Sequence, residues 1–339
     1  MEKIIKNENI KMLGAVLSII LIIIILRIIK VNITDDSITQ TNNHNTSPAE
    51  NIITNTDGSV SVTIMGNVLV SEKMRSSYRL YGTEGFMSKE IASTIKDSDI
   101  AIMNQTFCLS GSNELNYSAS TNDLDMLQDM GINMVSLANK YFRISGADSS
   151  GSIATTLKDN NINSSGAGRD LNDACSAAYL TYNDKTIGLL SVMKISGDNN
   201  EGIAVNSNGH VRSISGIYGE NSTDEICDSI KKAKKNCDFL IVNISWEDDS
   251  KKITKSMKSD AHSFIKSGAD IIAGCSDKSL DVEYYKNKPI IYGTGNFLNT
   301  GNPSDTKLYK AVISKNNKCK LTIHDCKTAA YFVEKKTSS

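Results

Sequence analysis

The sequence predicts an α/β fold with buried sheets. From Val60 onward, short apolar runs that end at glycine or asparagine alternate with stretches whose apolar residues recur at helical spacing. Short apolar runs are typical of strands buried on both faces, and this alternation is typical of largely parallel sheets joined by helices. No internal repeat of roughly 20–50 residues is present, which excludes a solenoid.

The elements follow in chain order. The first half is predicted to contain strands at 60–64, 100–103 and 134–137 and helices at 86–96, 121–130 and 151–160. In the second half, strands are predicted at 186–192, 239–244, 270–273 and 289–292 and helices at 223–235 and 252–267. Gly268 ends the last helix, as glycine commonly does. After Leu308 the pattern predicts β-hairpins at 309–315, 320–324 and 329–333.

The amino terminus predicts a membrane anchor. Residues 12–26 carry no charge, and Ile28 and Ile29 extend the apolar run beyond Arg27. At 1.5 Å per residue, residues 12–29 are just long enough to cross a bilayer. Three lysines precede the run, which favours a cytoplasmic amino terminus, and no cleavage site follows. We expect a single-pass signal anchor in the cell membrane, with the carboxyl-terminal domain extracellular; the alternative is a buried core helix.

Three regions follow from this interpretation: a cytoplasmic tail and anchor at 1–30, a flexible polar stalk at 31–59 and a folded domain at 60–335. The chain of 339 residues has 37 basic and 38 acidic residues, a balance that argues against nucleic-acid binding. The first thirty residues hold five of the basic and two of the acidic residues, so the remainder has a net charge of −4. This remainder would not be drawn to an anionic membrane surface.

Cysteine and histidine limit the metal chemistry. Seven cysteines form no CxxC pair, which excludes a zinc ribbon or a thioredoxin-like motif. An extracellular location permits disulfides, but the sequence does not give their connectivity. The alternative is that all seven cysteines are buried, reduced thiols. Only four histidines are present.

The segments at the predicted strand ends resemble one family, motif by motif. They are Gly66-Asn67, Asp99 to Thr106, Gly131 to Tyr141, Gly166 to Ala174, Ser245 to Asp249, Gly268 to Lys278 and Lys288 to Phe297. In this order they are similar to the motifs of the bacterial capsule-synthesis protein CapA family, also called poly-γ-glutamate synthesis proteins. The resemblance implies a calcineurin-like two-sheet sandwich flanked by helices, preceded by a transmembrane helix. It also implies a role in making a surface polymer.

The resemblance also implies that the metal ligands of the family are replaced. Asn67 stands for an aspartate, Thr106 for a glutamate, and Tyr141 and Ser245 for histidines. A histidine-rich cluster is replaced by Cys275, Ser276, Asp277 and Lys278. Two-metal hydrolysis needs carboxylates and imidazoles at such positions. We therefore expect no catalytic residue, no bound metal and no cofactor.

Nine motif positions are candidates for ligand binding. They are Asn67, Asn104, Asn139, Ser245, Trp246, Cys275, Asp277, Lys278 and Asn296. A neutral pocket with one ammonium group, that of Lys278, would suit an anionic polymer or ligand. The alternative is drift after loss of function, with Lys278 simply solvated.

Other sites are weaker hypotheses. Asp248, Asp249 and Asp277 would suit a loose Mg²⁺ or Ca²⁺ site. Cys275 and His262 would form a nucleophilic dyad without a third member, whereas a structural histidine is the simpler interpretation. Trp246 is expected either in the core or as a stacking platform.

The leading hypothesis is a membrane-anchored, metal-free binding or assembly component for a capsule or poly-γ-glutamate-type polymer, with polymer-synthesis proteins or an anionic polymer as partners. The rival is an active metal-dependent phosphoesterase or peptidase-like hydrolase that uses unusual ligands. A third hypothesis is a purely structural anchor for membrane partners.

Overall fold

The computed structural model describes residues 58–109, 118–119, 123–145, 147–195, 201–207, 215–246, 252–298 and 303–336. Within these ranges no helix is long and apolar enough to span a membrane. The expected anchor at 12–29, nearly all of the expected stalk, His44, His210, Asp248 and Asp249 lie outside the described residues.

The first sheet has eight strands in the order β19-β18-β17-β1-β2-β5-β6, with β16 paired to β1. Its central strands β1, β2, β5 and β6 are parallel, and β17, β18 and β19 continue the sheet as antiparallel strands. The strands are β1 (Val60–Val68), β2 (Ile100–Gln105), β5 (Met134–Ser136), β6 (Asn163–Ser165), β16 (Asn296–Leu298), β17 (Ser304–Ile313), β18 (Cys319–Ala329) and β19 (Phe332–Lys335).

The second sheet has seven strands in the order β11-β9-β12-β13-β15-β14, with β8 paired to β9. Strands β9, β12, β13 and β15 run parallel, whereas β8 and β14 are antiparallel to their neighbours. The strands are β8 (Ala178–Tyr182), β9 (Lys185–Lys194), β11 (Gly219–Glu220), β12 (Phe239–Trp246), β13 (Ile271–Cys275), β14 (Val282–Tyr285) and β15 (Lys288–Ile291). Two short ladders, β3 (Cys108–Leu109) with β4 (Ser118–Ala119) and β7 (Ala167–Gly168) with β10 (Gly216–Ile217), complete the strands.

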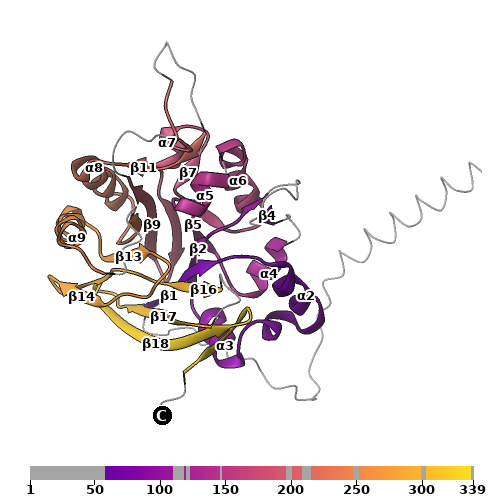
Figure 1. The fold of residues 1–339 in the computed structure, drawn as a ribbon. Coiled ribbons are helices and arrows are strands. Elements are labelled where there is room, and N and C mark those ends of the chain that lie inside the picture. Colours follow the sequence, from indigo (N-terminus) through magenta and orange to yellow (C-terminus); the bar gives the residue numbers. More distant parts are fainter. Residues whose placement is uncertain are drawn as a thin grey trace, which may run out of the picture. The chain divides into compact units, whose positions relative to one another are not determined.

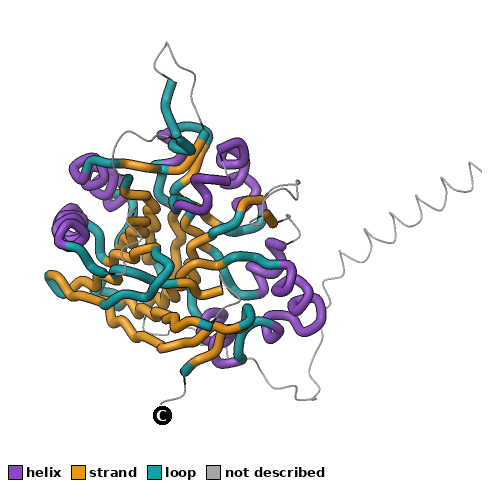
Figure 2. Tube along the Cα trace, in the orientation of Figure 1, coloured by secondary structure: helices purple, strands orange, loops and turns teal. Residues whose placement is uncertain are grey.

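The helices cover the outer faces of both sheets (Figures 1 and 2). One apolar cluster joins the first sheet to α2 (Glu72–Tyr81), α3 (Lys89–Lys96), α4 (Leu124–Asp129), α5 (Lys140–Ser145) and α6 (Ala147–Asp159). A second joins the other sheet to α7 (Leu171–Ala174), α8 (Thr223–Lys234) and α9 (Lys255–Ser267). The third cluster lies between the sheets and draws residues from both, among them Ile64, Ile102, Leu189 and Ile241. The described domain is therefore a two-sheet sandwich with helices on both sides, as expected.

Local signals set the helix starts. Ser71, Ser88, Ser222 and Thr254 each accept a hydrogen bond from a backbone N–H three residues ahead, so each satisfies a donor that the first helical turn leaves free. Two predicted helix starts were wrong for this reason. The expected helix at 86–96 begins at Lys89 after the Ser88 cap, and the one at 252–267 begins at Lys255 after the Thr254 cap.

Candidate functional site

The layer between the two sheets changes from apolar to polar at the carboxyl ends of the parallel strands. Along β12, Phe239 and Ile241 face the inter-sheet core, and Asn243 follows with the same strand parity. Ile100 and Ile102 are followed in the same way by Asn104 on β2. Because carboxyl ends of parallel strands meet at one edge, these polar side chains converge between the sheets.

Asn104 lies at the centre of this convergence and is fully buried. Its Oδ1 accepts a hydrogen bond of 2.7 Å from Asn243 Nδ2, which links the first sheet to the second. Its Nδ2 donates to Asn67 Oδ1 at 3.4 Å and to Thr294 Oγ1 at 3.2 Å. One neutral amide thus connects three strand ends.

Asn67, at the position of the family's aspartate, is also fully buried. Its Oδ1 accepts from the Cys275 thiol at 3.2 Å as well as from Asn104. Its Nδ2 donates to Asn296 Oδ1 at 2.8 Å and to the Ser276 carbonyl at 3.2 Å. An amide can do this because it is both donor and acceptor, whereas an aspartate here would accept only.

The network continues away from Asn104 through hydroxyl groups. Ser136 Oγ donates to Asn243 Oδ1 at 2.8 Å and lies 2.6 Å from Ser191 Oγ. Ser191 Oγ in turn accepts the backbone N–H of Ala138 at 3.1 Å. We call this set the strand-end network: Asn67, Asn104, Ser136, Ser191, Asn243, Cys275, Thr294 and Asn296.

A carboxylate with a cation of the protein itself closes one end of the network. Asp277 Oδ2 lies 2.9 Å from Lys140 Nζ, and Asp277 Oδ1 accepts a 2.6 Å hydrogen bond from the Tyr141 hydroxyl. The pair is partly exposed, with 31% of the Lys140 side chain and 39% of the Asp277 side chain accessible. The Lys140 ammonium therefore contacts Asp277, one of the residues that the resemblance aligns with the family's histidine-rich cluster.

Asn139 fixes the position of Lys140 and Tyr141. Its Oδ1 accepts the backbone N–H groups of Tyr141 and Phe142 at 3.1 and 3.0 Å, which begins helix α5. Its Nδ2 donates to the Gln105 carbonyl at 2.8 Å and ties the helix start to β2. Asn139 is thus a helix cap, and the side chains that contact Asp277 are the next two along the chain.

The arrangement suits hydrogen bonding better than cation binding. Among the described residues no group of three or more His, Cys, Asp or Glu side chains is placed to hold a metal ion. The amide oxygens of Asn67 and Asn104 already accept hydrogen bonds, and Asp277 is paired with Lys140. A divalent cation would have to displace these partners, so the residues present do not fit a two-metal centre.

The structure brings most of the nine predicted positions together and separates two. Ser245 is buried and pairs in register with Cys275 at the same strand end. Trp246 points to the opposite face of β12, where it stacks on Phe264 and donates to the Tyr292 carbonyl at 3.0 Å. Lys278 is exposed, and the cation beside Asp277 is Lys140 instead.

Sequence reasoning missed Asn243, Ser136, Ser191 and Lys140. The first three carry a usable signal, because each is a polar residue that follows inward-facing apolar residues of its strand at the same parity. Buried polar groups need partners, so three such residues on neighbouring strands predict a shared network. No local pattern distinguishes Lys140 from any exposed lysine.

His262 takes part in a structural contact and not in a dyad with Cys275. Its Nε2 lies 2.6 Å from Glu283 Oε1, and its ring stacks on Tyr285 at 3.9 Å. Glu283 also accepts a 2.8 Å hydrogen bond from the Tyr292 hydroxyl. The hydrogen bond from His262, followed by that from Tyr292, holds the pKa of the Glu283 carboxyl below its ordinary value.

This contact predicts a pH dependence. Because the pKa of Glu283 is lower in the folded state, its carboxylate adds stability above its unfolded pKa and loses that contribution as the pH falls through the folded value. Glu283→Gln is expected to lower the free energy of unfolding at neutral pH, and the difference from the wild type should shrink in acid. Urea unfolding at a series of pH values measures both; a difference independent of pH would contradict the assignment.

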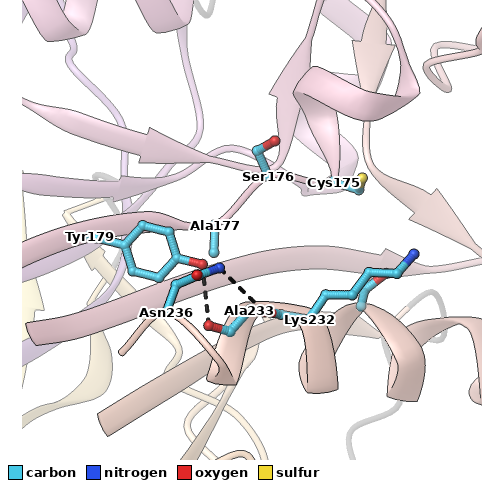
Figure 3. A pocket seen from close by; sticks show the side chains of 8 residues that line it. Cys175, Ser176, Ala177, Tyr179, Lys232, Ala233 and Asn236 are labelled. Carbon is cyan, nitrogen blue, oxygen red and sulfur yellow. Dashed lines mark hydrogen bonds between the residues drawn. The ribbon is translucent and has the colours of Figure 1, made fainter. Parts of the chain in front are cut away.

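A separate cleft of ≈ 350 Å³ lies between α8 and the segment that leads into β8 (Figure 3). It is lined by Cys175, Tyr179 and Lys232, among others, and the Tyr179 hydroxyl donates to the Ala233 carbonyl at 3.2 Å. Burial raises the pKa of the Cys175 thiol, so this group stays neutral. The cleft contains no residue of the strand-end network.

Comparisons with known proteins show what this chain is similar to. A curated relative, the "Capsule biosynthesis protein CapA" of Bacillus anthracis, is 23% identical over 256 residues, which cover 70% of this chain. The match covers 59% of that relative, so the chain spans about three-fifths of its length. Among solved structures, a putative 5'-nucleotidase from Staphylococcus aureus, crystallised with alpha-ketoglutarate, aligns with a TM-score of 0.45 and 14% identity over 83% of this chain and 55% of that one.

The family model "Bacterial capsule synthesis protein PGA_cap" matches residues 61–301, a span that contains the whole strand-end network, the second sheet and nearly all of the parallel strands of the first sheet. The chain belongs to this family of bacterial capsule synthesis proteins.

Proposed function

We propose that this chain is a metal-free binding or assembly component in the synthesis of a capsule-type surface polymer, anchored in the cell membrane by residues 12–29. Family membership supports the capsule-related role. The single observation that carries the metal-free part is the strand-end network, in which Asn67 and Cys275, two of the residues that stand for the family's ligands, take part in hydrogen bonds between neutral groups. The two-sheet sandwich flanked by helices also supports a calcineurin-like fold.

The physical reason for a metal-free site is that hydrogen-bond donors of the protein already occupy the lone pairs that a metal would need. A buried carboxylate without a counter-cation is costly, whereas a neutral amide that satisfies its donors and acceptors is not. Asn67 and Asn104 bond to each other, and within the described ranges the carboxylate beside them, that of Asp277, is balanced by Lys140. Such a site is stable without a metal and offers no open coordination position for a reactive water.

The metal content of the purified domain tests the proposal. Residues 58–339, without a histidine tag, are incubated with Mn²⁺, Zn²⁺ or Fe²⁺, desalted and analysed by mass spectrometry of the elements. We expect far less than one ion per chain. The variant Asn67→Asp/Lys140→Asn/Tyr141→His, which restores three of the family's residues, should hold more metal than the wild type. Two stoichiometric ions in the wild type would contradict the proposal.

Turnover assays test the rival hydrolase. Phosphodiester and γ-glutamyl peptide substrates, each with added divalent metals, are expected to remain intact. Turnover that Asp277→Ala abolishes would establish the rival, because Asp277 is the carboxylate at the network.

A further inference from the structure

Helix α9 and strand β14 lie side by side (Figure 1). Together they carry a row of charged and aromatic side chains. On α9, Lys258, His262 and Lys266 are spaced four residues apart and so lie along one side of the helix. On β14, Glu283 and Tyr285 face this side, since both contact His262. Lys286 follows at the turn. We call these six residues the α9–β14 row.

The row carries an excess of positive charge. Lys258 reaches Glu283 at 4.0 Å, but Glu283 is also bound by His262 and Tyr292. The ammonium groups of Lys266 and Lys286 lie 6.0 and 5.9 Å from the centre of the Tyr285 ring. Within the described ranges neither lysine has a carboxylate at ion-pair distance. Both are exposed, so these two lysines can meet an anionic partner without first breaking an ion pair.

Beside these lysines the second sheet ends in an open edge. β14 is the last strand of the sheet and pairs only with β15 among the described strands. Tyr284, in the middle of β14, is 58% exposed. The strand ends in a tight turn in which Lys286 and Asn287 both have positive φ. An unpaired edge offers backbone N–H and C=O groups to an extended chain.

The spacings match an extended polypeptide. Side chains on one face of a strand recur about every 6.6–6.8 Å. Positions four apart on a helix advance about 6 Å, which places Lys258 and Lys266 about 12 Å apart along the axis. If an acidic strand paired with β14, the carboxylates on one of its faces would therefore recur at nearly the same spacing as the lysines of α9.

We propose that the α9–β14 row is a docking surface for an extended acidic polypeptide, which adds a strand to β14 and places carboxylates against Lys258, Lys266 and Lys286. Tyr285 gives the stems of Lys266 and Lys286 a flat surface to lie against. The row shares no residue with the strand-end network, so this inference goes beyond the proposed function.

Fluorescence anisotropy at low salt tests the inference. The probe is a fluorescein-labelled oligomer of about fifteen α-linked glutamates, which is longer than the row. The wild-type domain is expected to bind. Lys266→Ala/Lys286→Ala should weaken binding roughly three- to tenfold, since two exposed ion pairs are lost. The matched control Lys96→Ala/Lys158→Ala removes two exposed lysines from α3 and α6 and should leave binding unchanged. No binding, or equal weakening by the control, would overturn the proposal.

Two further ligands test whether the partner is a polypeptide that adds a strand to β14. An alternating Glu-Pro peptide of equal charge lacks half of its backbone donors and should bind more weakly; equal binding would overturn strand addition. If the peptide does not bind, but anionic vesicles bind and this binding requires Lys266 and Lys286, the partner of the row is a membrane surface and not a polypeptide. Metal content is measured separately, so the two proposals can fail independently. A metal-free protein that does not bind the peptide overturns only this inference. A metal-loaded protein that binds the peptide overturns only the proposed function.

Discussion

Asn104→Ala is expected to destabilise the domain by about 3 kcal/mol, because it combines an orphaned buried donor with a cavity. Asn104 is fully buried, and its Oδ1 is the acceptor for Asn243 Nδ2 across the two sheets. Asn67 and Thr294 keep other partners, namely the Cys275 thiol and the Gly274 carbonyl. Most of the loss should therefore come from Asn243.

Urea unfolding of the domain measures this effect as a shift in the midpoint at an unchanged slope. Asn236→Ala is the matched control, because Asn236 is exposed and its side-chain amide donates a long hydrogen bond of 3.4 Å to the Lys232 carbonyl. We expect the control to lie within about 0.5 kcal/mol of the wild type. Equal effects of the two substitutions would mean that the network contributes nothing to stability.

Gly66→Ala is expected to be as damaging, at about 3 kcal/mol or more, for a purely steric reason. A Cβ at Gly66 would lie 1.9 Å from the Gly295 carbonyl oxygen and 2.8 Å from its carbon. Backbone atoms cannot rotate away as a side chain can, and Asn67 N–H donates to this same carbonyl at 2.8 Å. The substitution would therefore push β1 away from the segment that carries Asn296.

Comparison with Gly82→Ala separates the steric from the conformational contribution to the loss of stability. Gly82 has φ 60 and ψ −148, a backbone region that is essentially confined to glycine, but a Cβ added there would meet no other atom within 4 Å, so alanine carries only this conformational cost, about 1–3 kcal/mol. Thermal or urea unfolding of both variants gives the comparison. If Gly66→Ala were no worse than Gly82→Ala, the close approach of β1 to Gly295 would not be required for folding.

Sequence patterns predicted the strands with strong apolar runs. β1, β2, β5, β9, β12 and β13 all begin within one residue of their expected starts. Most of their ends were placed too early, because polar residues such as Asn104 and Ser245 continue these strands into the network. A polar residue normally signals the end of a buried strand, and here it signals an inter-sheet hydrogen bond.

Elements without such runs were missed. Helix α2 (Glu72–Tyr81) buries only Met74, so its sequence lacks the apolar stripe that predicts a helix. Strand β14 contains Glu283 and two tyrosines and is partly exposed throughout. Both elements depend on tertiary contacts or local caps, α2 on the cap at Ser71 and β14 on pairing with β15.

By itself, the sequence determined the α/β class and the order of the main strands, because both follow from residue type and spacing along the chain. The resemblance of its motifs gave the family, which the family model confirms, and the prediction that the family's metal ligands are replaced. Only the tertiary structure decided that Lys140 neutralises Asp277, that Trp246 faces the helices and that His262 bonds to Glu283. The two polar contacts join residues 137 and 21 positions apart, and such pairings are set by the packing of two sheets and their helices.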